Sequence, residues 1–176
     1  MSVLARYYID TNVLINYQLG HVVKGFADRA TRFLLQVEDG RYEGIVSILT
    51  LLEFISAARR ILAEKGDVDD SDQREEIVSE SVEAIFQMKN LTMVDFSHDE
   101  ITLSDSLLRA YDVLRRYFTG RTTSNGRHLT LKAADALHIV MAQRLGCDKI
   151  VTFDENFVET EPEIEPILLQ RWEPDA

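Results

Sequence analysis

Residues 132–157, KAADALHIVMAQRLGCDKIVTFDENF, predict a helix, a turn and a strand in immediate succession. We expect the helix over residues 131–145, with Thr130 as its N-terminal cap and Gly146 at its end, because hydroxyl side chains and glycine favour these two positions. The strand follows over residues 149–153 and is rich in β-favouring side chains. A helix that leads directly into a strand is the repeating unit of an α/β fold.

The rest of the chain continues this alternation. Strands are expected over residues 3–9, 44–48, 91–96 and 164–172, and helices over residues 13–19, 24–39, 51–63, 73–88 and 99–118. The pattern predicts a mainly parallel central sheet that is flanked by helices. No internal repeat or Pro-rich linker divides the chain, so we expect a single domain over residues 1–176. It should carry an acidic loop at about 66–72 and an acidic C-terminal extension at about 158–176.

The charge balance of the chain is strongly acidic. Its 176 residues include 19 Lys and Arg against 30 Asp and Glu, which gives a net charge of −11. A polyanion is repelled by such a surface, so broad nonspecific affinity for nucleic acid is excluded, although a local basic patch is not.

Cysteine use and hydropathy indicate the compartment. Cys147 is the only cysteine, so the chain forms no internal disulfide, and this fits a reducing compartment. We expect Cys147 to be a buried structural thiol rather than a nucleophile. No apolar run reaches the length of about 20 residues that a membrane span needs, and the N-terminus has no signal-peptide pattern. These features predict a cytoplasmic protein with no membrane association.

Acidic residues occupy the positions where parallel sheets build sites. Asp10 and Asp154 each follow a predicted strand, whereas Glu53 and Asp135 stand near the starts of predicted helices. The carboxyl ends of parallel strands meet at one edge, so the four side chains should converge there. Clustered carboxylates repel one another and favour a bound cation, and hard oxygen ligands suit Mg²⁺ or Mn²⁺. Taken singly, Glu53 or Asp135 could instead face solvent on the polar side of its helix.

At this point three segments resemble a known family. YYIDTNVLINY at 7–17, LLEF at 51–54 and the segment 132–157 are similar to PIN-domain nucleases, above all to VapC-type toxin ribonucleases of bacteria and archaea. The resemblance extends from about residue 6 to residue 157. It implies a three-layer PIN-like α/β fold and a metal-dependent ribonuclease.

The resemblance also assigns roles to individual residues. It implies a catalytic and metal-binding quartet of Asp10, Glu53, Asp135 and Asp154, in which Asp10 and Asp135 are the principal ligands. Thr11 and Asn12 match the polar pair after the first Asp and would orient ligands or water. Asn156 stands where some relatives carry a further acid, which implies weaker binding of a second metal ion.

His138 lies one helical turn after Asp135 on the same face. We expect it to orient Asp135 or to occupy a polar niche, and a role as a proton shuttle is the alternative.

Segment 109–132 opposes the overall charge, because it holds six basic residues against Asp112 alone. Five of the basic residues are candidate RNA contacts: Arg115, Arg116, Arg121, Arg127 and Lys132. Arginine binds phosphate in a bidentate manner, and the interleaved Tyr111, Tyr117 and Phe118 could stack on bases. In the alternative, the arginines pair with acids elsewhere and the aromatic side chains belong to the core.

Two functions follow from these observations. The first is a metal-dependent endoribonuclease that hydrolyses RNA phosphodiester bonds, with a role as the toxin of a type II toxin–antitoxin pair left open. The second is a PIN-fold RNA-processing or RNA- or protein-binding module with weak or lost nuclease activity. The resemblance implies an RNA substrate, a small antitoxin partner and a homodimer. An aspartyl-phosphate mechanism is disfavoured, because it would want an acid at the position of Asn12.

Overall fold

The computed structural model describes residues 4–23, 25–65, 68, 70–95, 103–117, 130–160 and 163–173. Within these ranges one five-stranded sheet has the order β3-β2-β1-β4-β5, and every neighbouring pair is parallel. The strands are β1 Arg6–Ile9, β2 Glu43–Ser47, β3 Leu91–Val94, β4 Lys149–Thr152 and β5 Glu165–Leu168. The predicted parallel α/β sheet is therefore confirmed, and β1 lies at its centre.

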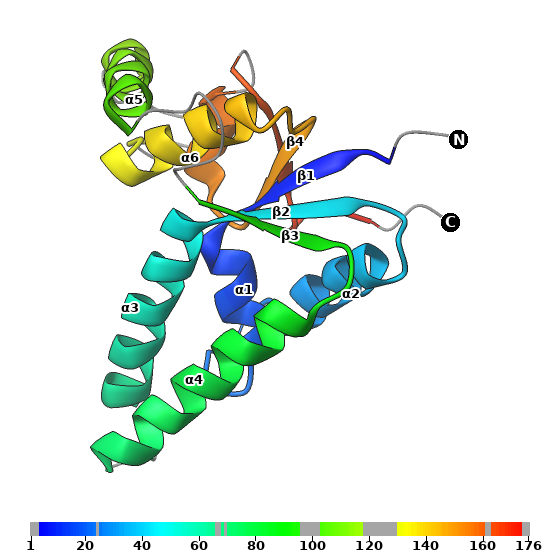
Figure 1. Cartoon of the computed structure of the whole chain (residues 1–176), viewed down its shortest axis with the longest axis vertical. Coiled ribbons are helices and arrows are strands. Elements are labelled where there is room, and N and C mark those ends of the chain that lie inside the picture. The colour runs from blue at the N-terminus through cyan, green and yellow to red at the C-terminus, as the bar shows by residue number, and fades with distance from the viewer. Residues whose placement is uncertain are drawn as a thin grey trace.

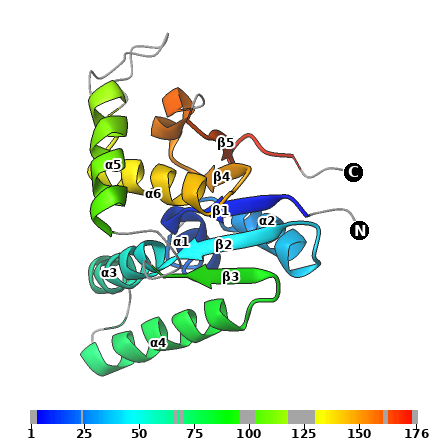
Figure 2. The same ribbon diagram turned by 45° about the horizontal axis from the view of Figure 1, so that its top comes forward.

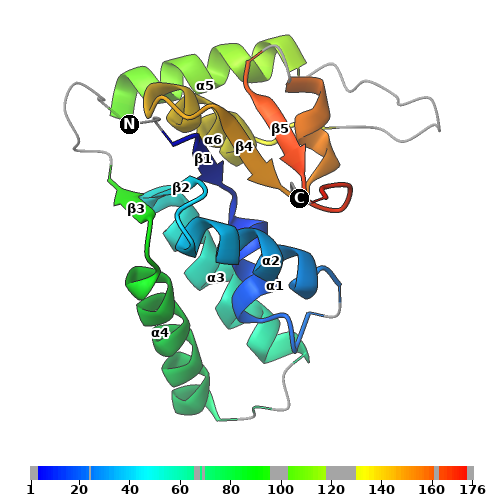
Figure 3. The same ribbon diagram turned by 90° about the vertical axis from the view of Figure 1, so that its right-hand side faces the viewer.

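Six α-helices cover the two faces of this sheet (Figure 1). They are α1 Thr11–Gln18, α2 Ala27–Glu38, α3 Ile48–Lys65, α4 Ser71–Gln87, α5 Leu103–Tyr117 and α6 Ala133–Arg144, with a short 3₁₀ helix, η1, at Glu155–Thr160. Figures 2 and 3 show α1 to α4 on one side of the sheet and α5 and α6 on the other. The molecule thus has three layers, as the PIN-like prediction requires.

Alternation along the strands builds one core on each face. Ile9, Val46 and Val151 pack with α1 to α4, whereas Tyr8 and Ile150 pack with α5 and α6. Successive side chains of a strand point to opposite faces. The central strands are covered on both faces, so their middle residues are apolar, while polar residues such as Ser47 and Thr152 stand at their carboxyl ends.

The ends of several elements differ from the predictions; α3, for example, begins at Ile48 rather than at residue 51. Helix α6 begins at Ala133 with Lys132 as its cap, so the prediction of Thr130 is wrong. The carboxylate of Asp135 accepts a hydrogen bond from the Lys132 N–H at 2.7 Å, which satisfies the backbone donor of the cap residue. Strand β5 spans four residues rather than the predicted 164–172, because the chain turns directly after it.

Several local predictions hold. Gly40 and Gly146 end α2 and α6 with φ of 74° and 63°, a conformation that glycine adopts without strain. Asp70, in the acidic loop, caps α4 by accepting a hydrogen bond from the Asp72 N–H at 2.8 Å. The whole of the predicted loop at 119–128 and the ends of the predicted helix at 99–118 lie outside the described residues.

Cys147 is half-buried, and burial raises the pKa of its thiol to about 12. The thiol therefore stays protonated near neutral pH, in keeping with the predicted structural role. Among the helices that the structure describes, none is long and apolar enough to span a membrane.

Gly20, after α1, leaves no room for a side chain. A Cβ there would overlap the Ala27 side chain and lie 2.5 Å from the Asn16 carbonyl oxygen. We expect Gly20→Ala to lower the free energy of unfolding by about 1–3 kcal/mol, as overpacking does. Urea denaturation measures this, with Gly25→Ala as the control because its Cβ would meet Asn16 only at 3.6 Å. Equal effects of the two substitutions would contradict the prediction.

Candidate active site

Asp10 lies at the end of β1 and is the N-cap of α1. Its Oδ1 accepts a hydrogen bond from the Thr11 N–H at 2.7 Å, and its Oδ2 accepts from Asn12 Nδ2 and Thr152 Oγ1, each at 2.6 Å. Only 6% of Asp10 is exposed. Burial raises the pKa of Asp10, and the charge of Glu53 adds to this rise. The side chain is therefore fixed in position, but its negative charge is poorly compensated.

The same hydrogen bonds place Asp154 beside Asp10. Asn12 Oδ1 accepts from the Phe153 N–H at 2.9 Å, and Thr152 Oγ1 accepts from the Asp154 N–H at 2.9 Å. The segment that leaves β4 is thereby fastened to the start of α1. Asn12 also donates to the Asp10 carboxylate at 2.6 Å, so one side chain contacts both Asp10 and this segment. Its role toward a ligand or water stays a prediction.

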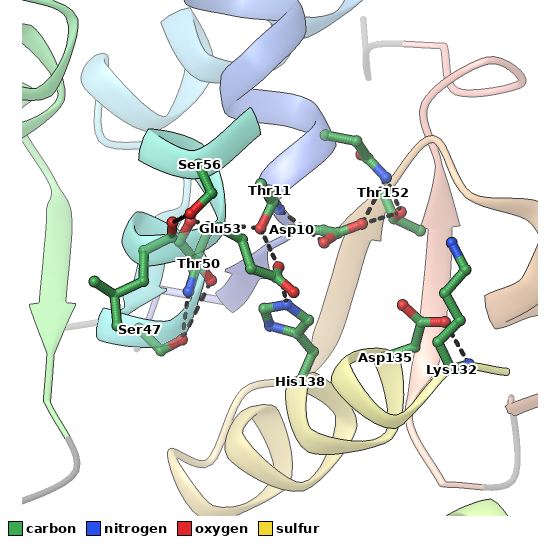
Figure 4. Close-up of polar contacts among 12 residues, drawn as sticks. Asp10, Thr11, Ser47, Thr50, Glu53, Ser56, Lys132, Asp135, His138 and Thr152 are labelled. Atoms are coloured by element: carbon green, nitrogen blue, oxygen red, sulfur yellow. Dashed lines mark hydrogen bonds and ion pairs between the residues drawn. The ribbon is translucent and has the colours of Figure 1, made fainter. Parts of the chain in front are cut away.

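Asp135 stands in the first turn of α6, across from Asp10 (Figure 4). Burial raises the pKa of Asp135 to about 6, and the charges of Asp154 and Asp10 contribute to the rise. The backbone hydrogen bond from Lys132 and the charge of that residue oppose it. The carboxylates of Asp10, Asp135 and Asp154 are thus near enough for the charges of the other two to raise the pKa of Asp135.

Glu53 is held from two sides at the start of α3. Its Oε2 accepts a hydrogen bond from Thr11 Oγ1 at 2.7 Å and lies 2.8 Å from His138 Nε2. Burial raises the pKa of Glu53, but the hydrogen bond and charge of His138, together with Thr11, outweigh burial and leave the pKa below its ordinary value. Glu53 is therefore ionised near neutral pH.

His138 is buried, with 1% exposed, and both of its ring nitrogens are engaged. Nε2 bonds to Glu53, and Nδ1 lies 2.8 Å from the hydroxyl of Tyr8, which in turn lies 2.6 Å from Ser47 Oγ. His138 thus occupies a polar niche, one of the two roles predicted for it, and its hydrogen bonds go to Glu53 and Tyr8 rather than to Asp135. The rotation of α6 over the sheet turns the imidazole toward α3 and β1 instead.

The charge of His138 follows from these neighbours. Burial lowers the pKa of His138, but the hydrogen bond to Glu53 and the charges of Asp10 and Glu53 raise it well above its ordinary value. A protonated imidazole donates from both nitrogens, which matches its two partners. One carboxylate of the quartet therefore has a buried cation beside it.

Polar residues of the site that sequence reasoning missed come from the strands and the start of α3. Tyr8, Ser47, Thr50 and Thr152 are buried and hydrogen-bonded around the carboxylates and His138. The signal for them was weak, since each is a single hydroxyl in a β-favouring or apolar run.

The donor set suits a divalent cation. Among hydrogen bonds between described residues, Glu53 Oε1, Asp135 Oδ1 and Asp154 Oδ2 accept none. Asp10 accepts three of the roughly four hydrogen bonds that a carboxylate can accept. Within the described ranges, no three His, Cys, Asp or Glu side chains are gathered closely enough to hold an ion. The site therefore suits a hard cation such as Mg²⁺ or Mn²⁺ in two respects: its free donors are carboxylate oxygens, and its negative charge is not fully compensated.

The remaining predicted residues lie around this centre. Asn156 donates its backbone N–H to Asp154 Oδ1 at 2.9 Å, and its side-chain oxygen accepts from the Thr130 N–H at 3.1 Å. Asn156 thus links the segment after β4 to the residues before α6. The charge of Lys132 lowers the pKa of Glu53 and opposes the rise at Asp135.

The arginines of α5 are partly engaged elsewhere. Arg116 pairs with Glu163, and Arg109 lies 3.5 Å from Asp105, so the pairing alternative is confirmed for these two. Arg115 is exposed, while Arg121 and Arg127 lie outside the described residues. Tyr111 is 62% exposed and Tyr117 is half-buried, so Tyr111 is not a core residue; Phe118 is not described.

A family model and a solved structure relate this chain to known proteins. The family model of the PIN domain matches residues 7–161. The chain belongs to the PIN domain family. The fold resembles that of Mycobacterium tuberculosis VapC20, described as a sarcin–ricin loop cleaving toxin, with a TM-score of 0.55 and 13% identity over 88% of this chain and 94% of that one. The search of curated proteins found no match.

The raised pKa of Asp135 has a consequence for stability without metal. Because the folded pKa of about 6 exceeds the ordinary value of 3.8, the folded chain binds the proton more tightly and loses stability as pH rises through 6. We therefore expect Asp135→Asn, which keeps an acceptor oxygen, to raise Tm at pH 7.5 in EDTA, where about 1 kcal/mol moves Tm by about 2–4 °C. This gain should vanish near pH 4, below the folded pKa.

Thermal unfolding at the two pH values tests this. Glu80→Gln, which removes an exposed carboxylate of α4, is the control and should leave Tm nearly unchanged at both. An equal change of Tm by Asp135→Asn at both pH values would contradict the assigned cause.

Proposed function

We propose that the protein is a metal-dependent endoribonuclease that hydrolyses RNA phosphodiester bonds. The observation that carries this proposal is the electrostatic coupling among the acids: burial and the charge of Glu53 raise the pKa of Asp10, and burial and the charges of Asp154 and Asp10 raise the pKa of Asp135. Membership of the PIN domain family supports nuclease chemistry. Buried carboxylates without a compensating cation destabilise a fold, so a purely structural role does not explain them. Hydrolysis that depends on a bound cation does make use of them.

Each residue of the quartet has a distinct part. Asp10 and Asp135 would hold Mg²⁺ or Mn²⁺, with Asp154 and Glu53 completing the site. The cation would supply the positive charge that a phosphodiester needs as negative charge develops on its oxygens. Asp10 enters this role already fixed by three hydrogen bonds, so little rearrangement is required.

Glu53 and Lys132 contribute in other ways. Thr11 and His138 hold Glu53 ionised and in one position, and an ionised carboxylate can accept a hydrogen bond or a proton from an attacking water. Lys132 places a cation one turn before Asp135, where it can contact a substrate phosphate. Arg115 extends this basic surface along α5.

We extend the proposal to a toxin of a type II pair that acts in the cytoplasm with a small antitoxin partner. The likeness of fold to VapC20, described as a sarcin–ricin loop cleaving toxin, supports this extension. Induced expression should arrest growth, and Asp10→Asn should relieve the arrest. Growth arrest by both the wild-type protein and Asp10→Asn would contradict the toxin role and would not bear on the nuclease proposal.

Cleavage assays test the nuclease. With Mn²⁺ or Mg²⁺ the protein should cut single-stranded RNA or a hairpin that carries the sarcin–ricin loop, and EDTA should stop it. Asp10→Asn and Asp135→Asn should each lower the cleavage rate at least about 100-fold, as loss of a transition-state charge contact does. Cleavage that survives both substitutions would point to a contaminant and contradict the assignment.

Titration calorimetry with Mn²⁺ separates this proposal from a binding module that has lost catalysis. The wild-type protein should bind Mn²⁺, and Asp135→Asn should bind it more weakly. RNA binding without any Mn²⁺ binding would favour the binding module, for which the neutral Asn156 is the one supporting feature.

Metal should also change RNA affinity. In Glu53→Gln, which prevents turnover, we expect Mg²⁺ to lower the Kd for RNA, because the cation offsets the repulsion between the polyanion and the remaining carboxylates. Fluorescence anisotropy with and without EDTA measures this. An unchanged Kd would contradict the charge argument, and Asp72→Asn, at the far exposed end of α4, serves as the control for net charge.

A further inference from the structure

A surface hollow of about 620 Å³ runs beside α3, next to the carboxylate site. Its lining combines one acidic, one basic, two hydroxyl and two apolar side chains: Glu53, Arg60, Thr11, Ser56, Leu52 and Ala57. Glu53 and Thr11 belong to the candidate active site, so the hollow opens from that site. We call it the α3 groove. None of the roles assigned above uses its other four residues.

The spacing of these residues places them along one face of α3. Ser56 and Arg60 follow Glu53 by three and seven residues, and such positions lie on the same side of a helix. At a rise of about 1.5 Å per residue, Arg60 stands roughly 10 Å along the axis from Glu53. Its long side chain can therefore contact a group bound in the groove, clear of the carboxylates.

The two neighbouring arginines of α3 have different surroundings. Arg59 pairs with Glu75 on α4, with Nε at 3.0 Å and Nη2 at 2.5 Å from the same carboxylate oxygen. None of the described residues forms an ion pair with Arg60, which is exposed and lines the groove. The cation that faces the groove is thus available to an outside anion, while its neighbour is already engaged.

The floor of the groove offers an apolar contact as well. Leu52 lines the groove and is 54% exposed. The Ser56 hydroxyl donates to the Leu52 carbonyl at 2.9 Å, so this part of the floor is locally ordered. An apolar side chain beside a free arginine suits a nucleotide, which has a flat apolar base and a charged phosphate.

We propose that the α3 groove binds the RNA strand on one side of the cleaved bond, with Arg60 on a backbone phosphate and Leu52 against a base or ribose. This inference rests on the proposed ribonuclease function and names where its substrate lies. Charge favours RNA as the occupant. The protein has a net charge of −11 and repels a polyanion, and Arg60 would offset that repulsion where the RNA strand runs next to the carboxylates. A peptide in the groove is the competing occupant.

The test compares Arg60→Gln with Arg59→Gln, a matched control one residue away on the same helix. Binding of a short fluorescein-labelled single-stranded RNA is followed by anisotropy in Mg²⁺ over a range of salt concentrations, in the inactive Asp154→Asn background. Arg60→Gln should raise Kd roughly fivefold and lower the slope of log Kd against log salt by about 0.7, the loss expected for one phosphate contact to a single strand. Arg60→Lys should restore the slope, and Arg59→Gln should stay near the parent protein.

Leu52→Ser provides an independent readout. It should weaken RNA binding without changing the salt slope, because it removes an apolar contact rather than a charge. Circular dichroism melting confirms that each variant is folded.

Each outcome bears on one proposal. Unchanged Kd and slope in Arg60→Gln, or equal changes in Arg59→Gln, would overturn the groove assignment and leave the groove to a peptide, even if the wild-type protein cleaves RNA. A loss of RNA affinity and of salt slope that is confined to Arg60→Gln supports RNA binding in the α3 groove. If the wild-type protein nevertheless cleaves no RNA with any metal, that result counts against the nuclease proposal and not against the groove.

Discussion

The buried carboxylate of Asp10 is the contact on which the candidate site depends. It accepts hydrogen bonds from Thr11, Asn12 and Thr152, and so it joins the end of β1 to the start of α1 and the end of β4. Buried polar donors need partners, so loss of this carboxylate would leave three of them unsatisfied. The buried carboxylate of Asp10 therefore links the ends of two central strands. It also places a carboxylate at this edge of the sheet.

The electrostatics divide the quartet into two parts. Glu53 has the His138 cation beside it, and its pKa lies below the ordinary value once both burial and these contacts are counted. Asp10 and Asp135 have raised pKa values, since burial dominates at each and neighbouring carboxylates add to it. The Asp10–Asp135 side is therefore where a bound cation would stabilise the ionised carboxylates most. The His138 side is already balanced, and it borders the α3 groove.

Sequence patterns predicted the parallel sheet, because it depends on periodicity and on strand ends, and the resemblance to PIN-domain nucleases implied the three layers. The meeting of all four acidic side chains at one edge stays a prediction. Asp10, for example, is recognisable as the first polar residue after a buried strand. Of the two roles predicted for His138, the polar niche agrees with the structure and the contact with Asp135 does not, since two residues on one helical face need not bond when a third element competes. The rotation of α6 brings His138 to Glu53 and Tyr8, which are distant in the chain. Arg60 was overlooked for a similar reason, because only the position of α4 shows which arginine of α3 is paired.

The order of the strands has a bearing on protein synthesis. β1 is made first, yet it lies between β2 and β4, and the hydrogen bond from Thr152 to Asp10 spans 142 positions of the chain. A growing polypeptide on the ribosome thus has Asp10 and Glu53 long before it has Asp135, Asp154 or the strand that holds Asp10 in place. Contacts of such long range form late in folding. Because Thr152 is synthesised 142 positions after Asp10, the hydrogen bond that joins them can form only once β4 has been made.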